Sequence, residues 1–511
     1  MVLSATIGGM IAKVLTAAVH GYEGILVEVE TDMKQGLPGI HIVGMGSKSV
    51  DEARERIRSA ITHSSLDIPA RKYVINLAPA DLPKQGSAYD VALAIAVLTS
   101  TGQLKPSEID GYLFCGELSL DGQIKAIRAP LHYAETAQKH GCHSVVVPIS
   151  QVQQAVLVPG ITVIGVQSLQ ELFLHLKGER LLNPAPASPP SSADDPPAIT
   201  IDDVIGQAQA KRALQIAAAG HHNLLLFGPP GAGKSMLAQA LQSILPALET
   251  EEVRAVTKLH GMRSGTQAVL TRPPFRSPHH RLSVTALLGG GTIPTPGEVS
   301  LAHAGVLFID EIAECRREVL EALRGPLEHR VVHVSRLYGG SSFPADCMLV
   351  ATMNPCPCGY YGSAIPCRCA AYQRVAYLHK LSGPLLDRID LIVPVHQTDI
   401  HTPIRTKKVY KTQQDTVVGS VIDAKNIQKK RYNSSIIYNA NLSARTVRQL
   451  VLSPNARNLL QAATKKLQLS HRTYFKIIKV ARTIADLEQH AHIEASDISE
   501  ALSLRGQLPA Q

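Results

Sequence analysis

One glycine-rich segment has the residue types and the spacing of a phosphate-binding loop. It reads G-P-P-G-A-G-K-S and fits the pattern G-x-x-x-x-G-K-S. In such loops, glycines let the backbone curl until its N–H groups point at an anion, and the following helix contributes the positive end of its dipole. The lysine then reaches the β- and γ-phosphates of a nucleotide, and the serine binds Mg²⁺. The predicted nucleotide-binding residues are Gly228, Pro229, Pro230, Gly231, Ala232, Gly233, Lys234 and Ser235.

The residues around this loop favour the phosphate-binding interpretation over a glycine-rich turn with a chance Lys-Ser pair. A short apolar run, Leu224–Phe227, precedes the loop and predicts a strand, and a helical pattern begins near Gly233. The motif carries its meaning only in this strand–loop–helix context.

A second motif places two carboxylates at the end of a predicted buried strand. Val306–Ile309 is entirely apolar, and Asp310 and Glu311 follow it directly. Ligands of open α/β sheets bind at the carboxyl ends of the strands. We therefore expect Asp310 to hold Mg²⁺ and Glu311 to orient or deprotonate the attacking water. Two solvated acids at a strand end are the alternative. The two motifs together predict an ATPase.

A third strand, Met348–Ala351, leads into Thr352, Met353 and Asn354. An asparagine at the tip of a strand next to the Asp310 strand can hold the lytic water. The alternative is an ordinary turn residue, because a proline follows it.

Four cysteines lie directly after this asparagine with the spacing C-x-C-x₈-C-x-C. Four thiolates can bind Zn²⁺ tetrahedrally and stabilise a loop that is too short to have a core. We predict a structural zinc site; an iron–sulfur cluster and free thiols are the alternatives. Nearby aromatic and basic side chains either stack on nucleic-acid bases or pack against the loop. The predicted metal ligands are Cys356, Cys358, Cys367 and Cys369.

The charge of the chain is unevenly distributed. The 511 residues carry a net charge of +9, but residues 401–511 alone hold 18 Lys/Arg against 7 Asp/Glu. This basic segment indicates either a nucleic-acid contact or a solvated helical face. No run of 18 apolar residues predicts a membrane span, and Met1–Leu15 lacks the basic start of a signal peptide. We expect a cytoplasmic protein with no membrane partner, whose four scattered cysteines are reduced core thiols.

Composition divides the chain into four parts. Residues 1–178 predict a mixed α/β domain, with short strands at Ile25–Glu30, Ile40–Val43, Tyr73–Leu77 and Ser144–Val147 and helices at Ser49–Ser64 and Ala88–Leu98. Residues 179–200 are rich in Pro, Ser and Asp and predict a linker. Residues 201–400 contain the three strands described above and predict a P-loop α/β core. Residues 401–511 predict a basic connector, with a helix over Val421–Arg431, and a C-terminal α-helical lid.

The first domain resembles the proteolytic domain of the Lon family. The resemblance rests on P-K-Q-G-S-A-Y-D (Pro83–Asp90) and F-C-G-E-L-S-L-D-G-Q-I (Phe114–Ile124). Where that family has its catalytic serine and lysine, this sequence has Ala88 and Leu131. A Ser/Lys dyad needs a hydroxyl and an amine. The resemblance therefore implies a Lon-like α+β fold without peptidase chemistry.

Almost the whole chain resembles the ComM/YifB group of magnesium-chelatase-like AAA+ ATPases. The resemblance is carried by the motifs R-P-P-F-R-S-P-H-H, P-G-E-V-S-L-A-H-A-G-V-L-F-I-D-E, M-N-P-C-P-C-G, L-S-G-P-L-L-D-R-I-D and A-R-T-I-A-D-L. The sequence predicts a mobile, glycine- and proline-rich loop before Val306, and a hairpin over Arg330–Arg336 and Ser342–Phe343 that turns at Gly339-Gly340. The resemblance implies that this loop is a helix-2 insert, that Arg330–Phe343 is a pre-sensor hairpin, and that Asn354 is sensor 1. It also implies Arg388 as the arginine finger of the next subunit's site and Arg472 as sensor 2, swinging with the lid onto the nucleotide.

An arginine finger has a clear physical basis. A guanidinium placed at the γ-phosphate stabilises the charge of the transition state and accelerates hydrolysis by about 10³–10⁵ in well-studied cases. An ordinary salt bridge from Arg388 to Asp387 or Asp390 is the alternative.

The resemblance implies a homo-hexameric motor that uses ATP and Mg²⁺ on single-stranded and branched DNA, and that promotes branch migration in natural transformation. The alternative function is a protein-remodelling ATPase of the magnesium-chelatase type. An ATP-dependent protease is disfavoured by Ala88 and Leu131.

Overall fold

The computed structural model describes residues 12–43, 48–80, 82, 84, 86–186, 198–264, 268–291, 294–336, 339–397 and 407–506. The chain folds into two compact units, each with its own hydrophobic core. Unit 1 comprises Met1–Ser191 together with Thr257–Val269 and Ile293–Thr295. Unit 2 comprises Ser192–Val256, Leu270–Thr292 and Pro296–Gln511. The boundary at residue 191 falls within the predicted linker, of which residues 187–197 lie outside the described part.

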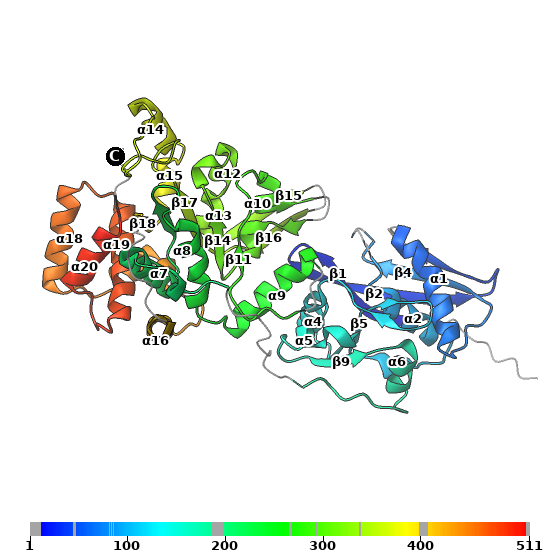
Figure 1. Ribbon diagram of the computed structural model, residues 1–511. Coiled ribbons are helices and arrows are strands. Elements are labelled where there is room, and N and C mark those ends of the chain that lie inside the picture. The colour runs from blue at the N-terminus through cyan, green and yellow to red at the C-terminus, as the bar shows by residue number, and fades with distance from the viewer. Residues whose placement is uncertain are drawn as a thin grey trace, which may run out of the picture. The chain divides into compact units, whose positions relative to one another are not determined.

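Unit 1 is built on a mixed seven-stranded sheet (Figure 1). The pairs β4–β2 and β2–β1 are antiparallel, whereas the pairs β3–β4, β1–β5, β5–β8 and β8–β9 are parallel. In spatial order the strands are β3 (Gly39–Val43), β4 (Lys72–Ala78), β2 (Glu23–Lys34), β1 (Ala12–His20), β5 (Tyr112–Phe114), β8 (Ser144–Pro148) and β9 (Thr162–Val166).

The core of unit 1 centres on helix α2 (Asp90–Ser100), whose residues are all buried. Alanine, valine, leucine and isoleucine make up most of this helix, and it packs on β1 and β2. The predicted strands Ile25–Glu30, Ile40–Val43, Tyr73–Leu77 and Ser144–Val147 and the predicted helices Ser49–Ser64 and Ala88–Leu98 are confirmed to within two residues at the helix ends. The remaining elements are α1 (Lys48–His63), α3 (Pro106–Ile109), β6 (Glu117–Leu118), β7 (Ile124–Lys125), α4 (Pro130–Lys139), α5 (Val152–Ala155) and α6 (Leu169–Leu176).

Unit 1 also includes residues 257–269, which the sequence had assigned to the ATPase core. The physical reason is a buried cation: Lys258 is 2 % exposed, donates to Glu135 and lies 4.1 Å from the centre of the Tyr22 ring. Composition alone gave no sign that this segment belongs to the first unit.

Unit 2 contains a five-stranded sheet whose paired neighbours are all parallel. The three central strands are apolar and almost completely buried, as expected when helices cover both faces of a parallel sheet. In spatial order the strands are β11 (Phe275–Arg276), β14 (Val306–Ile309), β17 (Met348–Met353), β10 (Leu224–Phe227) and β18 (Leu391–Pro394). The three strands predicted from the sequence are confirmed. β17 lies between β10 and β14, so the carboxyl ends of all three meet at one edge.

Helix α7 (Ala208–Gly220) precedes β10 and packs against β18. Its many alanines allow close packing. After the phosphate loop come α8 (Lys234–Ala240) and α9 (Thr250–Ser264). The predicted mobile insert contains the short helices α10 (Val284–Leu288) and α11 (Glu298–Leu301) and a two-stranded pair, β12 (Gly289–Gly290) with β13 (Thr295–Pro296). Its first part, β11, joins the core sheet, which the sequence did not predict.

The predicted hairpin is present as β15 (Val331–Arg336) and β16 (Gly339–Pro344). The turn was predicted at Gly339-Gly340, and this was wrong: Gly339 pairs with Arg336 and Gly340 with Ser335, so both glycines belong to β16. Two helices precede the hairpin, α12 (Arg317–Ala322) and α13 (Arg324–His329).

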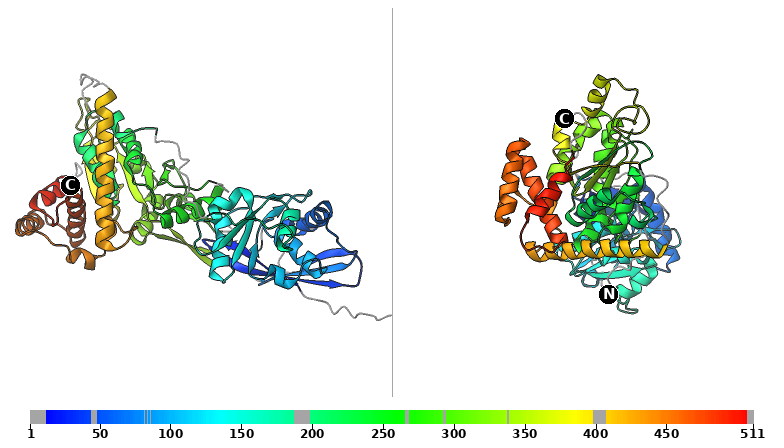
Figure 2. Two further views of the ribbon diagram at one scale, coloured as in Figure 1. Left: turned by 90° about the horizontal axis from the view of Figure 1, so that it is seen from below. Right: turned by 60° about the vertical axis from the view of Figure 1, so that its left-hand side comes forward.

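The C-terminal part begins with α16 (Lys407–Tyr432), a long straight helix (gold in Figure 2). The sequence predicted only Val421–Arg431, because Gly419 and the β-branched residues before it lower the helix propensity of the first half. Four further helices follow (orange to red in Figure 1): α17 (Ala444–Arg448), α18 (Pro454–Lys466), α19 (His471–Leu487) and α20 (Ala495–Ser503). No helix in the described part of the chain has both the length and the apolarity needed to cross a membrane.

Candidate active site

The phosphate loop joins β10 to α8 at the carboxyl edge of the sheet. Gly231 and Gly233 have φ of +75° and +85°, a region that favours glycine. Gly228 is required for another reason: a Cβ there would lie 2.1 Å from the carbonyl oxygen of Val395. The N–H of Gly228 donates to Met353 O over 3.1 Å and fixes the loop to β17. These contacts hold the backbone in its curled form.

Lys234 lies at the centre of this edge. Its Nζ donates to Gly228 O at 2.8 Å, to Pro229 O at 2.9 Å and to Asn354 Oδ1 at 3.1 Å. Only 8 % of the residue is exposed, and burial lowers its pKa although Asp310 and Glu311 oppose the shift. This ammonium group is the one that the motif assigns to the β- and γ-phosphates of a nucleotide.

Ser235 and Asp310 meet as the motif predicts. Ser235 Oγ lies 3.2 Å from each carboxylate oxygen of Asp310. A hydroxyl and a carboxylate at this spacing fit the oxygen ligands that Mg²⁺ prefers.

Thr352 is a site residue that sequence reasoning missed. Its hydroxyl donates to Asp310 Oδ1 and accepts the N–H of Glu311 at 2.9 Å, so one buried side chain orients both acids. The available signal was its position at the end of β17, two residues before Asn354.

Glu311 and Asn354 face each other across the edge. Glu311 has φ of +51°, a left-handed backbone conformation that is uncommon outside glycine and is often found at functional sites. Asn354 Nδ2 donates to Glu311 Oε1 at 3.4 Å, while its Oδ1 accepts from Lys234. A cavity of about 670 Å³ opens beside these two residues and is also lined by Tyr372 and Tyr377. A water molecule in this cavity can reach the carboxylate.

The four predicted metal ligands come together. Cys356 Sγ lies 3.4 Å from Cys358 Sγ and 3.6 Å from Cys367 Sγ, and the sulfur atoms of all four cysteines, Cys369 included, lie within 4.8 Å of one another. Zn–S bonds of about 2.3 Å would place the sulfurs of a tetrahedron about 3.8 Å apart, so the donor set fits Zn²⁺. Backbone N–H groups, first that of Tyr360, lower the pKa of Cys358 and favour its thiolate.

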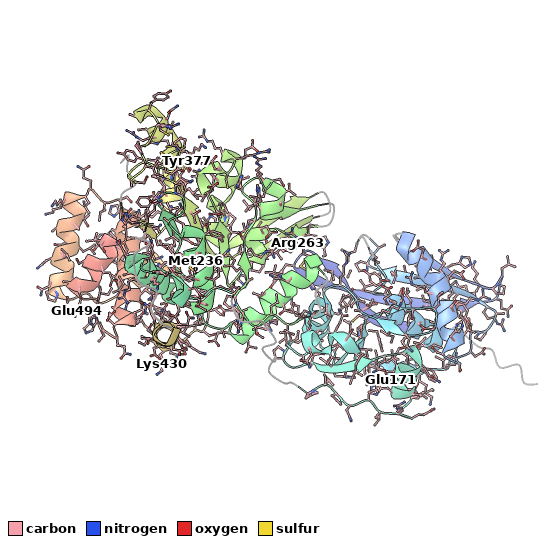
Figure 3. The ribbon with its side chains drawn as sticks, in the orientation of Figure 1. Glu171, Met236, Arg263, Tyr377, Lys430 and Glu494 are labelled. Carbon is pink, nitrogen blue, oxygen red and sulfur yellow. The ribbon has the colours of Figure 1, made fainter. Side chains whose placement is uncertain are left out.

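The cysteine loop packs against the phosphate loop. A Cβ on Gly359, whose φ is +84°, would lie 2.7 Å from Pro230 Cγ. Helix α14 (Ala371–Leu378) follows the loop and carries Tyr377, labelled in Figure 3. The other four cysteines are buried, as predicted: Cys115, Cys142, Cys315 and Cys347.

Arg388 and Arg472 lie together at the opposite, amino edge of the sheet. Both contact Glu328: Arg388 Nη2 donates to its Oε2, and Arg472 Nη2 lies 3.3 Å from its Oε1. Arg388 also donates to Arg324 O at 3.0 Å and to Pro384 O at 2.6 Å. The alternative salt bridge from Arg388 to Asp387 or Asp390 is therefore not formed. Arg472 therefore lies beside Arg388 and not beside Lys234. The length of β10, about 13 Å, separates these arginines from the phosphate loop.

Helix α19 is bonded to the segment that carries Arg388 through hydrogen bonds and an ion pair. Lys476 Nζ donates to Ile389 O at 3.0 Å and lies 3.2 Å from Asp390 Oδ1. Arg505 adds hydrogen bonds to Ile389 O and to Thr473 Oγ1. Burial raises the pKa of Asp390, but Lys476 and His222 outweigh it and hold that pKa well below its usual range. Arg472 begins the same helix, so the two arginines are held as one unit.

A cavity of about 490 Å³ opens beside the two arginines. Its cationic side chains outnumber its acidic ones, which makes it suited to an anionic partner. The cationic lining residues are Arg330, Arg388, Arg472, Lys476 and Lys479, and the acidic ones are Glu328, Asp346 and Asp390.

Three family models match the chain. "Magnesium chelatase, subunit ChlI" matches residues 200–402, "Subunit ChlI of Mg-chelatase" matches residues 29–151, and "Magnesium chelatase, subunit ChlI C-terminal" matches residues 411–505. A magnesium-chelatase 67 kDa subunit of Chlorobaculum tepidum is 24 % identical over 60 % of this chain and 43 % of its own length.

Two bacterial relatives match nearly the whole chain. The YifB protein of Escherichia coli is 41 % identical over 96 % of each chain. The competence protein ComM of Haemophilus influenzae is 39 % identical over 97 % of each chain. With its three magnesium-chelatase segments in the same order, this chain belongs to the ComM/YifB family of magnesium-chelatase-like AAA+ ATPases.

Proposed function

We propose that the chain is the subunit of a homo-hexameric, DNA-stimulated ATPase whose active site is completed between neighbouring copies. The observation that supports this most is the position of Arg388 and Arg472. They lie at the sheet edge opposite their own phosphate loop and line a cationic cavity. A head-to-tail contact, in which one copy's amino edge meets the next copy's carboxyl edge, generates a ring when the rotation between successive copies closes.

The carboxyl edge supplies the groups for nucleotide and metal. The Gly228–Ser235 loop and Lys234 hold the β- and γ-phosphates of ATP, and Ser235 and Asp310 hold Mg²⁺. The metal supplies charge neutralisation on the phosphates. Glu311 accepts the proton of the attacking water. Asn354 orients both the Glu311 carboxylate and Lys234 through hydrogen bonds.

The amino edge supplies the positive charge that a loose phosphoryl transition state needs. Arg388 acts as the finger on the next copy's γ-phosphate, and Arg472 adds a second guanidinium from α19. Hydrolysis then depends on how neighbouring copies are placed. That dependence couples chemistry to movement around the ring.

The proposed substrate of the motor is single-stranded and branched DNA, with branch migration in natural transformation and recombination as its cellular task in the cytoplasm. Two observations support it: the competence protein ComM matches over nearly the full chain, and residues 401–511 are strongly basic. Nucleic-acid phosphates are neutralised by this kind of lysine and arginine excess.

A protein-remodelling ATPase of the magnesium-chelatase type is the second candidate. It is favoured by the match of all three family models to chelatase subunit ChlI. The two candidates share the ATPase chemistry and differ in what stimulates it.

Two structural assignments complete the proposal. The four cysteines hold a structural Zn²⁺ that stiffens the loop against Pro230. Unit 1 is a Lon-protease-like domain without peptidase chemistry: Leu131 is buried, and Ser87, the neighbouring hydroxyl, donates to Glu117 and not to an amine.

The test is ATP hydrolysis with and without single-stranded and forked DNA, with Lys234→Ala as the blank. Strong stimulation by DNA supports the motor. Hydrolysis that is indifferent to DNA would favour the remodelling ATPase. No hydrolysis above the Lys234→Ala blank would refute both.

A further inference from the structure

Glu328 lies between the two arginines of the amino edge. Each carboxylate oxygen takes one guanidinium: Oε2 that of Arg388 and Oε1 that of Arg472. The residue lies near the end of α13, and its side chain is 40 % exposed. No sequence motif pointed to it, because a glutamate near the end of a helix is ordinary.

The charges around Glu328 keep it ionised. Burial disfavours its charged form, but attraction to Arg388 and then to Arg472 outweighs burial and lowers its pKa. The carboxylate therefore faces two cations at neutral pH. Arg388 is only 9 % exposed, whereas Arg472 is 41 % exposed, so the pair is open on the side of α19.

A carboxylate and a terminal phosphate are interchangeable partners for guanidinium groups, because each presents two anionic oxygens to planar N–H donors. We propose that Glu328 is a positioning residue that stands in for the γ-phosphate: it holds Arg388 and Arg472 together in the free subunit and releases them to a nucleotide carried by a second copy. This inference rests on the proposed function and adds to it the group that must be displaced.

In this exchange, the Glu328 carboxylate and the γ-phosphate of the neighbouring copy compete for the same two arginines. The phosphate carries more charge than the carboxylate and wins when a neighbour presents it, and the carboxylate wins otherwise. Glu328 thus raises the subunit concentration at which hydrolysis begins. Removing its charge lowers that threshold, whereas loss of a merely structural contact would reduce the maximal rate instead.

The experiment is the ATPase rate per subunit as a function of protein concentration. Glu328→Gln keeps the shape and removes the charge. Glu318→Gln is the matched control, because it makes the same change at an exposed position of α12. We expect the half-activating concentration of Glu328→Gln to fall about tenfold, the size of one charge-assisted hydrogen bond, and that of Glu318→Gln to stay at the wild-type value. An unchanged or higher half-activating concentration for Glu328→Gln overturns the inference.

A second measurement keeps the inference testable if the wild-type chain does not hydrolyse ATP, the result that refutes the proposed function itself. Inorganic pyrophosphate is titrated calorimetrically into Lys234→Ala, which disables the phosphate loop, and into Lys234→Ala with Glu328→Gln. Thermal melting checks that both are folded. Several-fold tighter binding by the double variant, lost on adding Arg388→Ala, supports the stand-in role. Equal affinity of the two variants overturns it.

Discussion

The two edges of the parallel sheet in unit 2 both concentrate charge, but they balance it differently. At the carboxyl edge, Asn354 is hydrogen-bonded to both Lys234 and Glu311. Asp310 accepts hydrogen bonds from the hydroxyl groups of Ser235 and Thr352. At the amino edge, the charged residues lining the cavity include more cations than acids. We propose that the first edge holds phosphate and metal and that the second supplies positive charge to a phosphoryl transition state.

Under the proposed function, this difference means that the catalytic groups are divided between the two ends of the strands. A single copy cannot bring Arg388 to its own Lys234, because the length of β10 separates them. The same parallel sheet that gathers strand ends into a nucleotide site also keeps the arginines away from it. The separation of the arginines from the phosphate loop is a consequence of the fold, and under the proposed function it makes the activity depend on assembly.

The largest expected effect comes from the amino edge. Arg388→Ala should lower the maximal ATPase rate by about 10³-fold or more, because it removes the guanidinium that stabilises transition-state charge. The maximal rate of Arg388→Lys, which keeps the charge but loses the planar guanidinium, should lie between those of Arg388→Ala and the wild type. The measurement is steady-state phosphate release at saturating protein. A rate within tenfold of wild type for Arg388→Ala would show that the amino edge has no catalytic role.

The carboxyl edge should show the next largest effect. Glu311→Gln should lower turnover by about 10²–10⁴, the usual contribution of a positioned general base. Nucleotide binding should survive, because Lys234 and the loop backbone are untouched. Binding of a fluorescent ATP analogue and phosphate release are measured on the same sample. Turnover near the wild-type rate would mean that the base is elsewhere.

A smaller effect is expected at the residue that links the two acids. Thr352→Val should reduce the ATPase rate, raise the Mg²⁺ concentration needed for it and destabilise the fold by about 1 kcal/mol, because the part-buried N–H of Glu311 loses its partner. Thr352→Ser keeps the hydroxyl and is the control. Denaturant unfolding and a Mg²⁺ titration check both quantities. Equal behaviour of the two variants would show that the hydroxyl is dispensable.

The smallest effect on rate should come from the cysteine loop. Cys367→Ser should abolish bound zinc, measured by elemental analysis, and lower the thermal midpoint, because the loop against Pro230 loses its cross-link. Cys142→Ala, in unit 1, should leave the zinc content unchanged. Full zinc occupancy in Cys367→Ser would contradict the four-cysteine site.

The sequence predicted the carboxyl edge well because its residues are close in the chain to strands with clear apolar patterns. Gly228–Ser235 follows β10, Asp310 follows β14 and Asn354 follows β17, so parallel pairing of these strands was enough to bring them together. Thr352 was not predicted as a site residue because a single threonine at a strand end matches no sequence motif.

The amino edge was harder to predict because its partners are distant in sequence and follow no motif. Arg388 and Arg472 were identified by resemblance, but their common partner Glu328 depends on how α19 packs against the core. The turn predicted at Gly339-Gly340 was wrong because composition marks glycines but does not fix strand pairing: the two glycines pair with Arg336 and Ser335 within the hairpin.

The most direct test of the divided site is to mix two inactive variants. Lys234→Ala keeps the amino edge, and Arg388→Ala keeps the carboxyl edge. An equal mixture that assembles at random would form intact contacts about a quarter of the time. We predict that the mixture hydrolyses ATP well above either variant alone. No recovery, with both variants shown to co-assemble, would contradict a site completed by a neighbouring copy.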